Sequence, residues 1–164
     1  MKTTRFPITP EDIRFMEMAA KIAEDNIDKG GGPFGAVIVR DGEVIATGAN
    51  SVTLTNDPTA HAEVNAIRQA CSKEQTFSLR GCKVYSSCEP CPMCLSALYW
   101  AGVDRIYYGN TQEDADKIDF SDKFIYRELE KSHLERSVPC IHIENDRTIK
   151  AFEKWAAKPD KVEY

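Results

Sequence analysis

Three residues in two separate segments of the chain can together bind a metal ion. Cys91 and Cys94 lie three positions apart, and His61 belongs to an earlier segment. We expect a helix to begin at each place, so that two thiols and one imidazole can face the same ion. Thiolate and imidazole groups suit Zn²⁺ among cellular metals. Three protein ligands leave the fourth tetrahedral position open for water, as in catalytic zinc sites, and zinc lowers the pKa of that water to about 7.

Glu63 supplies this predicted metal site with a proton carrier. It follows His61 by two residues, so its carboxylate can lie near the water without binding the ion. From there it can take a proton and deliver it to a substrate. The order His-x-Glu followed by Pro-Cys-x-x-Cys is the signature of zinc-dependent nucleobase deaminases. We therefore predict hydrolytic removal of an exocyclic amino group from a nucleobase.

Cys88 leaves a second interpretation of the same motif open. It precedes Cys91 by three residues, so spacing alone permits a closed structural site in which Cys88 joins the other three ligands. Such a chain would be a non-catalytic, zinc-stapled module that binds a partner protein. A closed site gives Glu63 no role, and we therefore interpret Cys88 as a small buried residue at the end of a strand.

Longer segments around these residues resemble the cytidine deaminase superfamily. They are GPFGAVIV at 32–39, NDPTAHAE at 56–63 and SCEPCPMC at 87–94. Within that superfamily, FSDKFIY at 120–126 and the final Glu163-Tyr164 are similar to the small zinc-dependent guanine deaminases of bacteria. The resemblance covers nearly the whole chain. It implies an α/β fold, a three-layer α/β/α sandwich around a mixed sheet, with one zinc ion per active site, and it implies hydrolysis of guanine to xanthine and ammonia.

The resemblance also implies which residues hold the base. Asn50 matches an asparagine that hydrogen-bonds the purine, Phe34 matches an aromatic wall, and Ala62 is a further substrate-binding position. An amide offers both a donor and an acceptor, and a flat base packs well on an aromatic side chain. By itself, Phe34 would be interpreted as a core residue.

Three C-terminal residues complete the implied site. Phe120 matches a base-stacking phenylalanine, Asp122 an acid that meets the amino and ring N–H groups and relays protons, and Tyr164 a terminal residue that closes the pocket. Without the resemblance, Phe120 would be a core residue, Asp122 a helix N-cap and Tyr164 part of a disordered end. The resemblance further implies a homodimer in which the segment from about 120 to 164 is exchanged between subunits.

The elements that must position these residues alternate along the chain. A β-hairpin is predicted from strands at 36–39 and 44–46 with a turn at 40–43. Further strands are expected at 83–86, 105–108 and 138–143, and further helices at 60–71, 92–100, 123–130 and 149–157. Such alternation favours one domain, residues 1–164, with helices on both faces of a mixed sheet.

An N-terminal helix is expected to cover one face of that sheet. Thr9 is a suitable N-cap and Pro10 suits the first turn, and the GGGP sequence at 30–33 ends the helix. The apolar residues at helical spacing, which predict its buried face, are Ile13, Met16, Ala20, Ala23 and Ile27.

Composition narrows the class of substrate. The net charge is −5 and no basic run is present, which argues against a surface for phosphate backbones. No apolar run approaches the roughly 20 residues needed to span a bilayer, and residues 1–11 lack the apolar core of a signal peptide. We expect a cytoplasmic protein that acts on a small molecule, guanine, without a nucleic-acid or membrane partner.

Related deaminases are the main alternatives to this prediction. A tRNA adenosine deaminase would share the zinc site but would need a basic rim for the phosphates around a flipped base. A cytosine deaminase or another aminohydrolase of small rings is a further alternative. The acidic balance and the segments 32–35 and 120–122 favour guanine.

Overall fold

The computed structural model describes residues 5–164 of the chain. These residues form two compact units, and the division between them falls after Lys123. The first unit contains the sheet and all the predicted site residues except Tyr164, while the second unit begins at Phe124. Among the described residues, no helix is long and apolar enough to cross a membrane.

A mixed sheet of four strands forms the centre of the first unit. Its strands are β1 (Gly35–Arg40), β2 (Glu43–Ala49), β3 (Cys82–Cys88) and β4 (Arg105–Asn110), in the spatial order β2-β1-β3-β4. β1 is antiparallel to β2 and β3, whereas β3 and β4 are parallel. The predicted mixed sheet is therefore confirmed, and each strand is longer than its sequence pattern indicated.

The hairpin turn follows the backbone rule for tight connections. Asp41 and Gly42 both have positive φ, at 50° and 79°. A two-residue turn of this kind matches the right-handed twist of the flanking strands, and aspartate and glycine are the residues that adopt it most readily. The turn predicted at 40–43 is thus confirmed.

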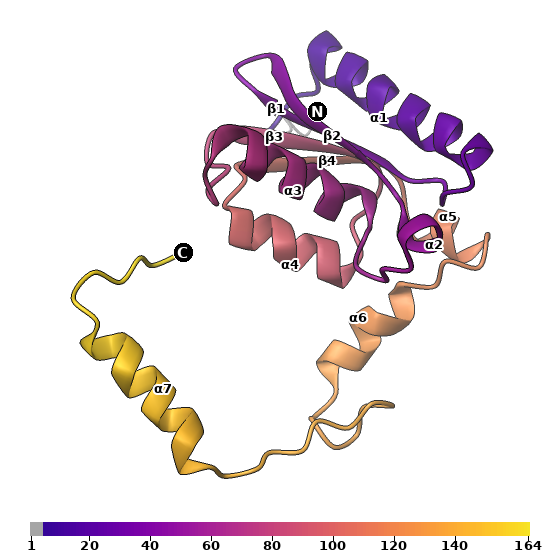
Figure 1. The fold of residues 1–164 in the computed structure, drawn as a ribbon. Helices are drawn as coiled ribbons and strands as arrows, with labels where there is room; N and C mark the ends of the chain where they lie inside the picture. Colours follow the sequence, from indigo (N-terminus) through magenta and orange to yellow (C-terminus); the bar gives the residue numbers. More distant parts are fainter. Residues whose placement is uncertain (1–4) are drawn as a thin grey trace. The chain divides into compact units, whose positions relative to one another are not determined.

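Helices cover both faces of the sheet (Figure 1). α1 (Pro10–Asp28) packs on one face, and α3 (Ala62–Glu74) and α4 (Pro92–Ala101) pack on the other. This arrangement is the predicted three-layer α/β/α sandwich.

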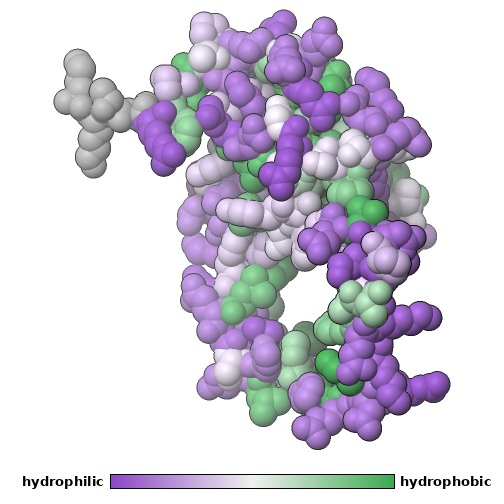
Figure 2. Space-filling view, turned by 90° about the vertical axis from the view of Figure 1, so that its left-hand side faces the viewer, coloured by the Kyte–Doolittle hydropathy of each residue, from purple (hydrophilic) through white to green (hydrophobic). Residues whose placement is uncertain are grey.

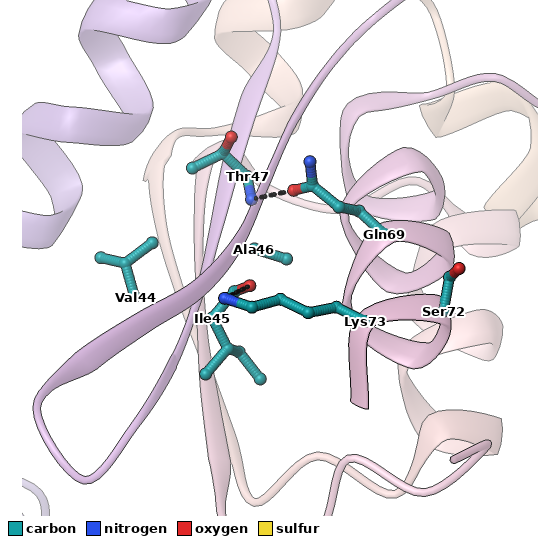
Figure 3. Close-up of a pocket in the computed structure, with 7 residues that line it drawn as sticks. All are labelled: Val44, Ile45, Ala46, Thr47, Gln69, Ser72 and Lys73. Carbon is teal, nitrogen blue, oxygen red and sulfur yellow. Dashed lines mark hydrogen bonds between the residues drawn. The ribbon is translucent and has the colours of Figure 1, made fainter. Parts of the chain in front are cut away.

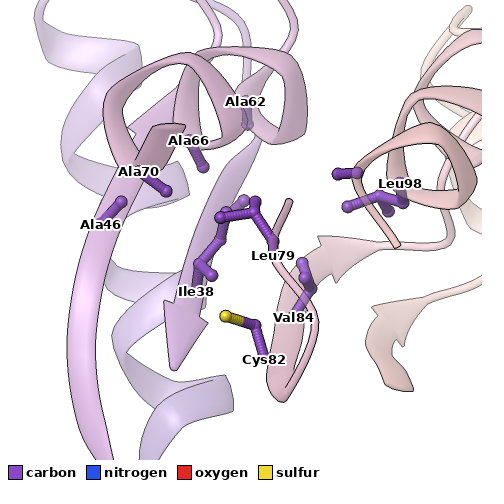
Figure 4. Packing of buried hydrophobic residues seen from close by; sticks show 11 residues of the cluster. Ile38, Ala46, Ala62, Ala66, Ala70, Leu79, Cys82, Val84 and Leu98 are labelled. Atoms are coloured by element: carbon purple, nitrogen blue, oxygen red, sulfur yellow. The ribbon is translucent and has the colours of Figure 1, made fainter. Parts of the chain in front are cut away.

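Successive side chains of β3 belong to the two hydrophobic clusters on opposite faces of the sheet. Val84 belongs to the hydrophobic cluster under α3 and α4, and the adjacent Tyr85 belongs to the cluster under α1. Figure 4 shows Ile38 and Val84 among the residues of the first cluster, which also contains Ala66 of α3. Successive strand residues point to opposite faces, so this register decides which β3 side chains reach the layer of α3 and α4.

Gly48 lets α3 lie close to β2. A Cβ atom at this position would come within 2.1 Å of the Ala62 carbonyl oxygen and 2.6 Å of the Ala66 backbone nitrogen. Only glycine leaves room for such an approach. The first turn of α3 is consequently held directly against the sheet.

The buried face of α1 differs from the predicted one. The buried residues are Asp12, Phe15, Ala19, Ala23 and Asn26. Ile13 and Ile27, predicted to be buried, are 52% and 55% exposed. The buried face differs because two polar residues of α1 form hydrogen bonds in the interior. Asp12 Oδ1 accepts a 2.6 Å hydrogen bond from the Tyr85 hydroxyl group. Asn26 donates hydrogen bonds to two backbone carbonyl groups, which are described with the site. Hydrophobic periodicity does not detect such partners.

Side chains of α3 cover part of the exposed edge of β2. Gln69 Oε1 accepts a 2.8 Å hydrogen bond from the Thr47 backbone N–H, and Lys73 Nζ donates to the Ile45 carbonyl at 3.3 Å. Figure 3 shows both side chains reaching from α3 to the strand, beside a groove of about 560 Å³. Unpaired strand edges invite pairing with other chains, so these contacts protect the edge. None of the predicted site residues lines this groove.

Short helices connect the main elements. α2 (Val52–Thr55) and α5 (Gln112–Asp116) were not predicted. Thr111 caps α5 through a capping box with Asp114. α6 (Lys123–Glu130) has the predicted bounds, and α7 (Asp146–Ala157) begins three residues before the predicted start. The earlier start arises because Asn145 acts as N-cap and accepts a 2.8 Å hydrogen bond from the Arg147 backbone N–H.

The strand predicted at 138–143 is not present in the structure. This segment has no regular secondary structure, and Val138, Ile141 and Ile143 are exposed. A strand needs a neighbour for its backbone groups, and Pro139 also removes one donor. The alternation of apolar residues was therefore insufficient to predict a strand.

Exposed apolar side chains characterise the second unit. All residues of α7 are exposed, including Ile149, Phe152 and Trp155, and the amphipathic α6 exposes Ile125 and Leu129. Figure 2 shows such apolar residues, in green, at the surface among hydrophilic ones. Amphipathic helices normally bury their apolar stripe, whereas α6 and α7 expose apolar residues of theirs.

Candidate metal centre and active site

The three predicted metal ligands meet at the starts of two helices. His61 is the N-cap residue of α3, Cys91 is the N-cap residue of α4, and Cys94 lies in the first turn of α4. The His61 Nδ1 atom lies 3.5 Å from Cys91 Sγ and 3.4 Å from Cys94 Sγ. All three ligand atoms lie within 4.8 Å of one another.

This donor set fits a zinc ion. With Zn–S distances of about 2.3 Å and Zn–N distances of about 2.1 Å, tetrahedral geometry places such atoms roughly 3.6 Å apart. The observed separations agree with that value, and two sulfurs with one imidazole are typical zinc ligands. Three ligands also leave one coordination position for water or substrate.

The electrostatics of α4 favour a thiolate at Cys91. A hydrogen bond from the Cys94 thiol, supported by His61 and by the Cys94 backbone N–H, lowers the pKa of Cys91 to about 4 although burial opposes the shift. The same contact raises the pKa of Cys94. Binding of a divalent cation favours the thiolate form of both sulfurs.

Cys88 lies outside this cluster. Among the described residues, the metal-binding group contains three side chains, and Cys88 is not one of them. Its sulfur instead approaches the Thr111 carbonyl oxygen at 3.8 Å, and burial raises its pKa to about 11. A neutral thiol suits a small buried residue at the end of β3. The closed four-ligand site is thus not supported.

Glu63 lies in the first turn of α3, on the same helix start as His61. Its side chain is almost fully buried, with an exposed fraction of 6%. Its Oε1 atom accepts a 2.7 Å hydrogen bond from the Ser86 hydroxyl group. Its side chain also forms a hydrogen bond with the Cys94 thiol, so the carboxylate lies beside the metal ligands, where a carboxylate can carry protons.

Asn50 is buried at the end of β2, and its backbone is fixed by a residue that sequence analysis did not identify as important. Asn26 Nδ2 donates to the Asn50 carbonyl and to the Gly32 carbonyl, both at 2.8 Å. The adjacent glycines leave no space for a side chain, since a Cβ at Gly31 would lie 2.3 Å from Asn26 Nδ2. Asn26 therefore links two segments, the loop that precedes Phe34 and the backbone of Asn50. The signal available in the sequence was a polar residue four positions before the GGGP segment.

Phe34 and Phe120 are brought together from distant parts of the sequence. Their ring centroids lie 4.9 Å apart at an interplanar angle of 86°, an edge-to-face pair. Asp122 follows, and its Oδ1 atom is buried without a hydrogen-bond partner in the described part of the chain. Burial raises the pKa of Asp122, and the negative charge of Cys91 adds to the shift. An unpaired buried acceptor is suited to a ligand N–H group.

The remaining two predicted substrate residues are Ala62 and Tyr164. Ala62 is fully buried in the core cluster, so its side chain is not open to a substrate. As the first residue of α3, it has a backbone N–H group that the helix itself does not use. Tyr164 belongs to the second unit and is 80% exposed. Both assignments stay predictions.

Comparison with known proteins identifies the family. A family model for the zinc-binding region of cytidine and deoxycytidylate deaminases matches residues 9–110. The match includes His61, Glu63, Cys91 and Cys94. The chain belongs to this deaminase family. Its cofactor is zinc, and the cluster of His61, Cys91 and Cys94 fits the zinc site.

Relatives within the deaminase family differ in how much of the chain they match. Guanine deaminase from Bacillus subtilis is 46% identical over 151 residues, which are 92% of this chain and 97% of the relative. A crystal structure of guanine deaminase from Bacillus subtilis superposes with a TM-score of 0.90 at 44% identity, covering 96% of this chain and 99% of that one.

Two further deaminases match shorter parts of the chain. The tRNA-specific adenosine deaminase from Aquifex aeolicus is 42% identical over 94 residues, which are 57% of this chain and 62% of the relative. A structure of guanine deaminase from Nitrosomonas europaea has a TM-score of 0.65 at 30% identity, covering 74% of this chain and 69% of that one.

Proposed function

We propose that this chain hydrolyses guanine to xanthine and ammonia. The observation that carries the proposal is the 46% identity to guanine deaminase from Bacillus subtilis over 92% of the chain. That match includes most of the region after residue 110, where Phe120 and Asp122 lie. By contrast, the adenosine deaminase relative matches 57% of the chain. The net charge of −5 also disfavours a tRNA substrate.

Recognition of the base rests on four side chains of the first unit. The edge-to-face pair of Phe34 and Phe120 offers an apolar wall for the flat purine. The amide of Asn50 supplies a donor and an acceptor for the edge of the ring. The unpaired oxygen of Asp122 accepts from the guanine N–H groups, and the backbone N–H of Ala62 is available as a further donor. Together these groups orient the C2 amino group toward the metal ligands.

Glu63 moves the protons in the proposed reaction. His61, Cys91 and Cys94 would hold the zinc ion, which would supply a water with a pKa near 7. Glu63 accepts a proton from that water and transfers it to N3 of guanine while the oxygen adds to C2. Glu63, assisted by Asp122, then takes the second proton, from the hydroxyl group added at C2, and passes it to the amino group, which leaves as ammonia as the C2–N bond breaks. The sum is guanine and water giving xanthine and ammonia.

We also propose that the chain forms a homodimer in which the second unit packs on the partner. The exposed apolar residues of α6 and α7 support this proposal, because amphipathic helices of this kind are rarely left without a partner. In such a dimer, Tyr164 would close the pocket of the other subunit. The predicted start of the exchanged segment is about residue 120; we propose a start at Phe124, the first residue of the second unit.

Product formation from guanine tests the proposed function. The zinc-loaded chain is expected to release xanthine and ammonia in equal amounts from guanine. Ammonia release from adenosine in RNA with no turnover of free guanine would contradict the proposal and leave the zinc chemistry intact.

A further inference from the structure

We propose that Ser86 is a positioning residue for Glu63, and that its hydroxyl group fixes the carboxylate in the orientation required for proton transfer. The inference rests on the proposed function, since it gives Ser86 its role through the proton carrier of that reaction. The contact itself is the 2.7 Å hydrogen bond from Ser86 Oγ to Glu63 Oε1.

The position of Ser86 in β3 makes a hydroxyl group unexpected there. Along this strand, Cys82 and Val84 belong to the hydrophobic cluster under α3 and α4, and alternation places Ser86 on the same face. Ser86 is only 2% exposed. Burying a hydroxyl group without a partner costs free energy, so an apolar residue would suit this face better unless the hydroxyl had a specific task.

The backbone of Ser86 holds its side chain on a rigid support. Ser86 pairs with Ala36 of β1 on one side and with Tyr108 of β4 on the other. β3 is therefore an inner strand at this point, and its backbone is fixed from both sides. The hydroxyl group thus extends from the centre of the sheet to the first turn of α3.

This contact selects one orientation of the Glu63 carboxylate. A glutamate side chain has several rotatable bonds, and its free rotation would spread the carboxylate over many positions. Ser86 engages one oxygen, Oε1, and so limits the carboxylate to one orientation beside the metal ligands. Holding a reacting group in its productive geometry accounts for a large share of catalysis. The expected contribution is to kcat, because the same contact does not touch the base.

Ser87 provides a matched control on the neighbouring position. It is also buried, but it faces the opposite side of the sheet, and its Oγ accepts a 3.0 Å hydrogen bond from the Gly35 backbone N–H. Ser87→Ala therefore removes a buried hydrogen bond of the same strand without reaching Glu63. Ser86→Thr retains the hydroxyl group and serves as the conservative variant.

The experiment measures kcat and KM for guanine, together with zinc content, for the three variants. Ser86→Ala is expected to lower kcat about tenfold, equivalent to about 1.4 kcal/mol of transition-state stabilisation, with KM within about twofold of the parent. Ser86→Thr should recover most of the lost kcat, and Ser87→Ala should keep kcat within about twofold. Zinc content should stay at one ion per chain throughout. A Ser86→Ala kcat equal to that of Ser87→Ala, or loss of zinc from Ser86→Ala, would overturn the proposal.

A second measurement keeps this test independent of activity. Urea unfolding midpoints are compared for Ser86→Ala in the parent and in a Glu63→Ala background. Because the hydrogen bond needs both partners, the downward shift caused by Ser86→Ala should largely disappear when Glu63 is already absent. Equal shifts in both backgrounds would show that no such contact forms. If the parent chain fails to turn over guanine while the shifts differ, the proposed function fails and the Ser86–Glu63 contact stands.

Discussion

The Nδ1 atom of His61 lies 3.5 Å from the sulfur of Cys91, although the two residues cap different helices. This proximity depends on both helices beginning at the same end of the sheet layer. Each helix start contributes partial positive charge that favours an anionic ligand. The geometry therefore predicts which cysteine substitutions remove zinc and which do not.

Cys91→Ala is expected to abolish zinc binding and guanine turnover, because it removes one of three ligands. Cys88→Ala, three residues earlier on the same segment, is the matched control and should retain one zinc ion per chain. Metal analysis after gel filtration measures both. Chelation of zinc from the parent should likewise remove activity, and added Zn²⁺ should restore it. Zinc loss from Cys88→Ala would instead favour the closed four-ligand site.

Glu63→Ala is expected to retain zinc and to lose turnover. The side chain is not a ligand, whereas general acid–base catalysis contributes about 10²- to 10⁴-fold to rates. We predict a fall of kcat within that range, measured as ammonia release from guanine. Near-parental kcat in a zinc-loaded Glu63→Ala chain would show that another group carries the protons.

Tyr85→Phe is expected to destabilise the fold in a pH-dependent manner. Burial alone would raise the pKa of Asp12, but hydrogen bonds from Tyr85 and Thr9 outweigh it and lower the pKa below its ordinary value of 3.8. A carboxyl group with a lowered pKa in the fold stabilises it above the ordinary pKa, and this contribution is lost as the pH falls through the folded pKa. At pH 7, loss of the hydroxyl group should cost about 1–3 kcal/mol of unfolding free energy.

Urea unfolding between pH 7 and pH 3 measures this effect. The difference between the parent and Tyr85→Phe should begin to shrink below about pH 4, and it should shrink further as the pH falls through the lowered folded pKa of Asp12. Tyr107→Phe is the control, since Tyr107 stacks on Tyr85 with ring centroids 4.9 Å apart but its hydroxyl group bonds with Arg105. A stability difference for Tyr85→Phe that is the same at pH 7 and pH 3 would contradict the assigned role of Asp12.

Mixing of inactive chains tests the exchange of the second unit. If Tyr164 closes the partner's pocket, Tyr164→Ala and Glu63→Ala chains refolded together should regain activity, because one site of the mixed dimer contains both intact residues. Asp122→Ala mixed with Glu63→Ala should not regain activity, because Asp122 lies beside the metal ligands of its own chain. Ammonia release and the molar mass from light scattering measure the outcome. A monomeric mass, or complementation by Asp122→Ala, would contradict this arrangement.

The metal site was predictable from the sequence because its residues carry their chemistry in their type and spacing. The hairpin turn, the helix that starts at Pro92 and the mixed sheet were predictable for a similar reason, since each depends on local signals. The buried face of α1 was not, because Asp12 and Asn26 are buried by partners that lie far away in the sequence. The prediction of a strand at 138–143 was wrong because a strand forms only when a neighbouring strand pairs with its backbone.

The hydrogen bonds that Ser86 and Asn26 form with site residues could not be predicted from the sequence either. A serine within a strand and an asparagine near a helix end have many ordinary roles, and only the fold brings one to Glu63 and the other to Asn50. The resemblance assigned Phe34 and Phe120 separately to substrate binding, and only the structure showed that the two rings pack together. Residue type thus predicted the chemistry of the site, and tertiary contacts determined how it is held.

The central claim is that guanine is the substrate, and a parallel assay of ammonia release tests it most directly. The substrates are guanine, adenine, cytosine, guanosine and a tRNA anticodon stem-loop, each presented to the same zinc-loaded preparation, with Glu63→Ala as the blank. We predict rapid release from guanine with stoichiometric xanthine, and little or none from the other four. Ammonia release from the stem-loop or from cytosine, with no release from guanine, would contradict this claim.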